Sequence, residues 1–155
     1  NISHNLGSAP KLVIVKRTDD ISDWAVGFST FNKAMYLNST IRSQMSAVYW
    51  NNTAPTASVF SIGTSGATNN NGDTFVAYCW APVAGYSSFG KYTGNGSTDG
   101  PFVYTGFRPA FTMIKIMDEV SKYKNICIEI AYITIIKVIK RKYLIDDINI
   151  IEWLY

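Results

Sequence analysis

The stretch "DTFVAYCWAP", residues 73–82, decides the fold class that we predict for this chain. Aromatic and β-branched residues are typical of strands, and successive side chains of a strand point to opposite faces. A strand that is apolar on both faces is expected to lie centrally in a sheet, covered on both sides. Both alternating sets are apolar here, with Phe75, Ala77, Cys79 and Ala81 on one face and Val76, Tyr78 and Trp80 on the other.

Similar short runs flank this strand and are separated by Gly, Asn, Ser and Pro. All eleven glycines and all five prolines lie before residue 110, where they favour turns and disfavour helices. Only residues 39–50 are compatible with a helical turn or two, and the Asn71-Gly72 pair predicts a hairpin turn. The expected strands, which together predict an all-β sandwich, are residues 11–17, 24–28, 34–38, 58–63, 73–82, 89–94, 101–106 and 111–116.

The composition excludes several classes of function. The net charge of +3 comes without a stripe of Lys and Arg interleaved with aromatics before residue 137, which argues against nucleic-acid binding. The two cysteines, Cys79 and Cys127, have neither metal-site nor redox spacing. The longest apolar run, residues 126–136, contains Glu129 and is too short for a membrane span of about 20 residues.

Part of the sequence occurs twice. "GFRPAFTMIK" (106–115) repeats "GSAPKLVIVK" (7–16) at an offset of 99 residues, with the same Gly, Pro and Lys and matched apolar positions between them. The correspondence continues to Tyr123, which falls on Trp24, and then stops. The chain therefore contains one repeat unit and the beginning of another.

Residues 124–155 are a different kind of sequence. They contain eleven isoleucines and no Gly or Pro, and most of their residues belong to types that codons of A and T alone can encode. Our hypothesis is that this Ile- and Lys-rich extension is a translated frameshift or a mis-assembled gene end, so that deleting it would leave stability unchanged or improve solubility. The alternative is a genuine amphipathic strand-and-helix extension.

Three stretches carry a resemblance to a known family: "SHNLGSAPKLVIVKR" (3–17), "YWNNTAPTASVFSIGTS" (49–65) and "GDTFVAYCWAPVAGYSSFGKYTGNGSTDGPFVYTGFRPAFTMIK" (72–115). Residues 3 to about 123 resemble a repeated domain of unknown function in bacteriophage virion proteins, especially tail-fibre-like proteins of marine phages. The resemblance implies an antiparallel, jelly-roll-like β-sandwich similar to concanavalin and laminin-G domains. It implies no catalytic motif.

The resemblance also implies a division of the chain. Residues 1–90 would be a sandwich repeat that lacks its first strand, 91–123 would begin a second repeat, and 124–155 would be the atypical extension. Because a missing strand leaves an unpaired sheet edge, we expect "FGKYTG" (89–94) to fold back and complete the first sandwich. Strand exchange between copies, as in a fibre of stacked units, is the alternative.

Catalytic and metal-binding side chains are scarce before the extension. Residues 1–115 contain five acids, and three of them crowd one loop (19–23) that we interpret as a solvated turn. A glycosidase would need two carboxylates placed across a sugar, and His4 has no nucleophile pattern near it. The stretch "TNNNGD" (68–73) lacks the bidentate Glu of a calcium loop, and we interpret it as a turn. We expect no enzyme activity, no cofactor and no metal.

Carbohydrate recognition is the functional candidate that the residues support. Sugar sites combine an aromatic face with amide or carboxylate groups. Tyr49, Trp50, Asn51 and Asn52 stand together in one loop-like stretch, and Tyr86 adds a further ring. The alternative is that Trp50 caps the sandwich core.

The sequence thus predicts a structural module of a phage virion, in a tail fibre or another host-facing appendage. Its expected partners are host surface glycans and further copies of the virion protein in a homo-oligomer. A glycan-cleaving domain, which the scarcity of acids disfavours, and a ligand-free spacer are the alternatives.

Overall fold

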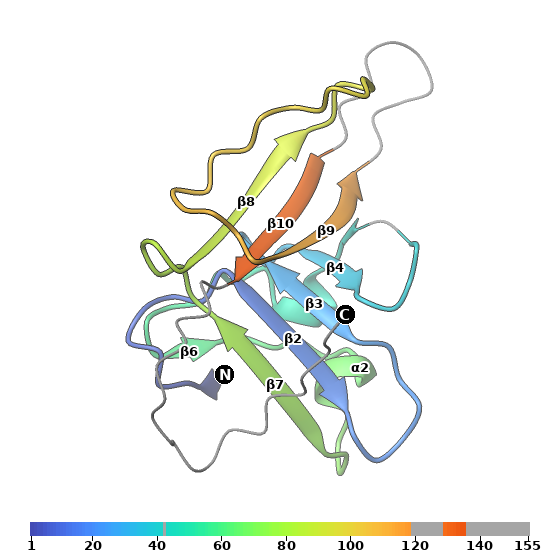
Figure 1. Cartoon of the computed structure of the whole chain (residues 1–155). Coiled ribbons are helices and arrows are strands. Elements are labelled where there is room, and N and C mark those ends of the chain that lie inside the picture. The colour runs from blue at the N-terminus through green and yellow to red at the C-terminus, as the bar shows by residue number, and fades with distance from the viewer. Residues whose placement is uncertain (42, 119–128, 136–155) are drawn as a thin grey trace.

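The computed structural model describes residues 1–41, 43–118 and 129–135 (Figure 1). Every strand pair in this part of the chain is antiparallel. The two helices within it, α1 (Ala47–Trp50) and α2 (Gly66–Asn69), have four residues each. The prediction of an all-β fold with antiparallel sheets is confirmed. None of the described helices is long and apolar enough to cross a membrane.

A five-stranded sheet is the central layer of the domain, with the strand order β5-β4-β3-β2-β7. Strand β2 is paired on both sides, since Leu12 lies opposite Phe28 of β3 and Trp80 of β7. Strand β7 lies at the edge of this sheet, so the predicted central position of residues 73–82 is wrong. The strand bounds are β2 (Leu12–Arg17), β3 (Ala25–Phe28), β4 (Lys33–Tyr36), β5 (Gln44–Met45) and β7 (Phe75–Trp80).

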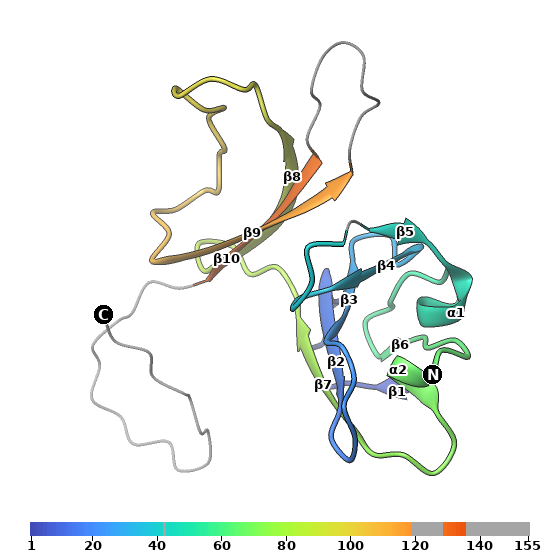
Figure 2. The same cartoon turned by 90° about the vertical axis from the view of Figure 1, so that its right-hand side faces the viewer.

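A three-stranded sheet packs on one face of the central sheet, which gives the domain its sandwich-like character (Figure 2). Its order is β8-β10-β9, with β8 at Ser87–Thr93, β9 at Phe111–Asp118 and β10 at Glu129–Ile135. Met117 of β9 is buried between the sheets, and Phe89 of β8 packs against the same core. Strand β9 is the repeat copy of β2, so equivalent segments of the two units meet in one core.

The segment "FGKYTG" does not fill the edge of the central sheet as we expected. Strand β8 pairs along its whole length with β10, from Ser87 opposite Ile135 to Thr93 opposite Glu129. Its backbone groups find partners there, while the ring of Phe89 still covers the central sheet. The expected edge pairing is therefore wrong, because this strand contributes by face packing instead.

Part of the atypical extension belongs to the fold. Strand β10 occupies the middle of the three-stranded sheet and pairs with both β8 and β9. Without it, β8 and β9 would lose their common partner. The prediction that residues 124–155 can be removed without loss of stability stays untested, but these pairings make a loss of stability the expected result.

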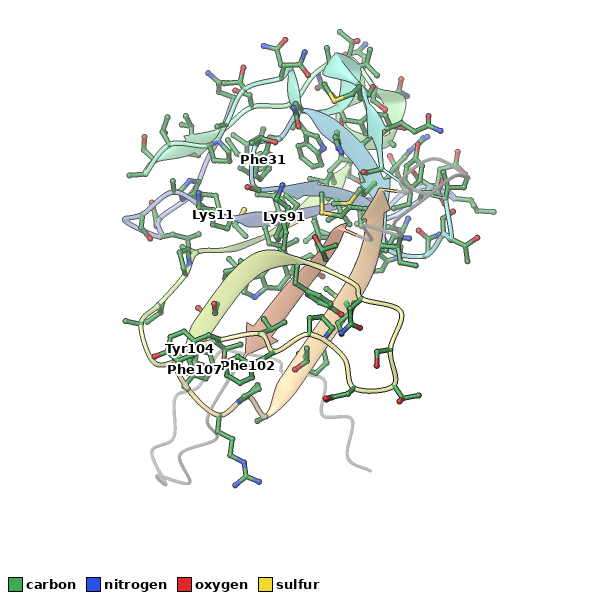
Figure 3. The ribbon with its side chains drawn as sticks, turned by 90° about the horizontal axis from the view of Figure 1, so that it is seen from above. Lys11, Phe31, Lys91, Phe102, Tyr104 and Phe107 are labelled. Atoms are coloured by element: carbon green, nitrogen blue, oxygen red, sulfur yellow. The ribbon has the colours of Figure 1, made fainter. Side chains whose placement is uncertain are left out.

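The other face of the central sheet carries a second core. Its buried members include Phe31 and Trp50, and the short elements α1, α2, β1 (Ile2–Ser3) and β6 (Val59–Phe60) lie over it. Figure 3 shows Phe31 in this layer. Gly27 of β3 makes room for it, since a Cβ there would lie 2.4 Å from Phe31 Cε1 and 2.9 Å from Trp50 Cε2. The buried residues are Val13, Val15, Ala25, Phe31, Trp50 and Phe60.

Two local predictions differ from the structure. The Asn71-Gly72 pair does form a turn, with Gly72 at a φ of 85°, but the turn joins α2 to β7 and not two strands. The residues before the turn are helical, and Ser65 caps this helix by accepting a hydrogen bond from Ala67 N. Residues 101–106, expected as a strand, lie in the loop between β8 and β9, where Phe102 and Tyr104 are highly exposed (Figure 3).

Candidate carbohydrate-binding site

Trp50 belongs to the core and not to a surface that could meet a sugar. Its side chain is fully buried at the end of α1, and its ring meets Phe31 edge-on, with centroids 5.5 Å apart and planes at 86°. From the sequence, Trp50 is compatible with either a core position or a ligand contact. The structure places Trp50 in the core, so Trp50 is removed from the predicted binding residues.

The structure does not place the other predicted residues around an aromatic ring that a sugar could reach. Asn51 and Asn52 are exposed after α1 in left-handed conformation, and Tyr49 is half-buried with its hydroxyl bonded to that of Tyr36. Burial, helped by the Tyr49 hydrogen bond, raises the pKa of Tyr36 to about 12. Tyr86 is exposed on the turn between β7 and β8, whereas Tyr49 and the two asparagines lie in and just after α1.

Accessible apolar surface is found on the edge strand β7. Its apolar side chains face both ways, yet Ala77 and Tyr78 in its middle are exposed. Apolar residues that a fold leaves exposed on a strand edge often mark binding surfaces. Two such surfaces meet at β7, one on each face.

The first surface is a cavity of about 200 Å³ between β2, β7 and the segment from β6 to β7; we call it the Asn70 pocket. It is smaller than typical drug-sized pockets of roughly 300–1,000 Å³, so it suits one ring-sized group. Its apolar wall is formed by Ile2, Val15, Phe60, Ile62, Phe75 and Ala77. Its polar wall is formed by Thr68, Asn69, Asn70 and Asp73.

The polar wall is held in place by hydrogen bonds of the turn that carries it. Asn69 Nδ2 donates to Gly63 O at 2.8 Å, and Asn70 Nδ2 donates to Asp73 Oδ2 at 2.6 Å. Arg17 at the end of β2 approaches the same carboxylate oxygen with Nε at 2.9 Å. The amide and carboxylate groups are thus oriented before any ligand arrives, which lowers the entropy cost of binding.

Arg17 joins the pocket rim to the acidic loop that follows β2. Its Nε lies 2.8 Å from Asp19 Oδ1, and its guanidinium is 3.4 Å from Asp20. The hydrogen bond from Arg17, together with one from Thr74 N, lowers the pKa of Asp19. The hydrogen bond to Asp19 in turn raises the pKa of Arg17, so the contact between these two residues favours the charged form of both.

The second surface is a row of three aromatic rings on the opposite face of β7. Tyr78 lies between Trp24 and Trp80, with centroid distances of 6.5 and 6.1 Å and planes within about 21° of parallel. Tyr78 is 43 % exposed, whereas Trp24 and Trp80 are half-buried against the core between the sheets. This aromatic row is flat but offers less enclosure than the pocket.

The described residues contain no group of three or more His, Cys, Asp or Glu side chains that could hold a metal ion. The segment 68–73, whose spacing we had weighed against a calcium loop, instead supplies the polar wall of the pocket. Sequence reasoning missed this role. The available signal was a run of hydroxyl, amide and carboxylate residues directly before a strand that is apolar on both faces.

Fold and pocket define a sandwich-like, antiparallel all-β domain with a small amide-rimmed cavity. The chain belongs to the family described as domain of unknown function DUF7483, whose model matches residues 1–127. The match ends near the start of the Ile- and Lys-rich extension. Neither the curated proteins nor the solved structures contain a significant match.

Proposed function

We propose that this domain is a non-enzymatic, carbohydrate-binding module and that the Asn70 pocket receives one sugar ring. The observation that carries the proposal is the combination in one cavity of an apolar wall containing Phe60 and Phe75 with amide, hydroxyl and carboxylate groups. Sugars present an apolar ring face and a hydroxyl edge, and such a cavity complements both.

The setting we propose is a bacteriophage virion, in a tail fibre or another host-facing appendage. It is supported by the resemblance of residues 3–123 to repeated virion domains. In that setting the ligand would be a host surface glycan and the partners would be further copies of the virion protein. The exposed rings of Phe102 and Tyr104, which are 89 % and 78 % accessible, favour such association.

The acids at the pocket rim support binding over cleavage. A glycosidase needs one carboxylic acid whose raised pKa lets it donate a proton. Asp19 has a lowered pKa instead, and it shares Arg17 Nε with Asp73. Two carboxylates that neutralise one guanidinium are poor candidates for an acid and a base.

The test is a glycan array with the full chain, followed by calorimetric titration of the glycans that bind. We expect Asn70→Ala to weaken binding about tenfold, as for the loss of one or two hydrogen bonds. The matched control is Tyr86→Ala, which removes an exposed ring of the originally predicted set and should leave affinity unchanged. Loss of binding in Tyr86→Ala but not in Asn70→Ala would refute the pocket, product release would support cleavage, and a silent array would support the spacer.

A further inference from the structure

We propose, resting on the proposed function, that the Asn70 pocket prefers an amino sugar with a free ammonium group and rejects acidic sugars. The pocket wall contains one carboxylate, Asp73, whose side chain is 13 % exposed. Its Oδ2 already accepts a hydrogen bond from Asn70 Nδ2 and lies 2.9 Å from Arg17 Nε in an ion pair. A cationic group that enters the cavity therefore meets an oriented carboxyl group.

The neighbouring charges reinforce this preference. Arg17 is the cation of the cluster, and three carboxylates surround it: Asp73 and Asp19 at Nε and Asp20 at the far side of the guanidinium. Lys16 is a second cation here, since it lines the same hollow as Asp19 and Asp20, and its ammonium donates to Arg17 O at 2.5 Å. Three carboxylates thus face two cations at this rim, which leaves an excess of one negative charge.

The excess negative charge at the rim is close enough to influence a charged sugar that approaches the pocket. Charges within about 10 Å influence each other at 0.1 M salt, and pairs beside low-dielectric walls are screened less. Asp20 is 60 % exposed and Asp19 34 %, so their field extends into the solvent through which a sugar approaches. A uronate carboxylate would meet like charge, and discrimination by repulsion is an effective source of specificity.

The test compares three matched ligands on the full chain at about pH 6, where a sugar ammonium and the carboxylates are ionised. These are oligomers of glucosamine, of N-acetylglucosamine and of galacturonate. We expect glucosamine oligomers to bind about fivefold more tightly than N-acetylated ones at 20 mM salt, and galacturonate not to bind. The difference should shrink to within about twofold at 0.5 M salt.

Two variants locate the effect. Asp73→Asn should reduce the preference to within about twofold, while Asp99→Asn, which makes the same charge change on the loop between β8 and β9, should preserve it. If Asp73→Asn fails to fold, Asp20→Asn takes its place, since that exposed side chain makes only the 3.4 Å contact. It should roughly halve the preference.

The outcomes separate the two proposals. Binding of N-acetylated or acidic oligomers that is lost in Asn70→Ala but shows no preference for ammonium would overturn the charge selectivity and leave the sugar pocket standing. Preference that persists unchanged in both Asp73→Asn and Asp20→Asn would also overturn it. Absence of binding by all three oligomers together with a silent glycan array would overturn the proposed function itself.

Discussion

Gly27→Ala tests the layer in which the structure places Trp50. The added Cβ would lie 2.4 and 2.6 Å from Phe31 Cε1 and Cδ1 and 2.9 Å from Trp50 Cε2, against about 3.5–4.0 Å for an unstrained carbon contact. Both rings are fully buried, so neither can turn into solvent. We expect overpacking to cost about 3 kcal/mol. The better strand propensity of alanine offsets up to about 1 kcal/mol of this.

The net loss of about 2 kcal/mol should lower the midpoint of thermal unfolding by roughly 4–8 °C for a domain of this size. Circular dichroism and urea titration of the full chain measure it. The control is Gly100→Ala, where no atom lies within 4 Å of the added Cβ, and which should be neutral or slightly stabilising. If Gly27→Ala proves as stable as Gly100→Ala, Phe31 and Trp50 do not pack over β3 as described.

Three further results are expected. Truncation after Tyr123 removes β10 and should lower the unfolding midpoint by about 5 °C or more, whereas an unchanged midpoint would mean that the three-stranded sheet adds no stability. The lowered pKa of Asp19 stabilises the fold above the ordinary carboxyl pKa of about 3.9, and this contribution is lost as pH falls through the lower folded value. Asp19→Asn should therefore flatten the acid limb of a stability–pH curve, and an identical limb would contradict the Arg17 contact. Burial raises the pKa of Cys79, so in a Cys127→Ser background its alkylation at pH 8 should be slower than that of the urea-unfolded chain, and equal rates would refute its burial.

Much of the strand content follows from local sequence. Residues 11–17 and 24–28 contain the observed strands β2 and β3, and residues 34–38 overlap β4, because apolar and β-branched runs bounded by turn residues have few other ways to bury their side chains. The repeat also carried structural information, since β9 is a strand at the position that its copy β2 predicts. These features depend on residues close together in the chain.

The binding site was predicted less well. Trp50 was one of two rings beside two amides, and nothing in the local sequence distinguishes a ring that packs inward on Phe31 from one that faces solvent. The pocket joins Val15 of β2 to segments around Phe60 and Asn70, which are separated by more of the chain than any local pattern spans. Such a site exists only after the strands have paired.

An all-β protein with a repeated strand and few acids before its extension can be predicted from the amino-acid sequence alone. The edge position of β7, the pairing of β8 with β10 and the burial of Trp50 become visible only in the folded chain. The physical reason is that alternation sets which side chains share a face. Contacts between segments far apart in the chain determine what covers that face. They also determine which strand pairs with each sheet edge.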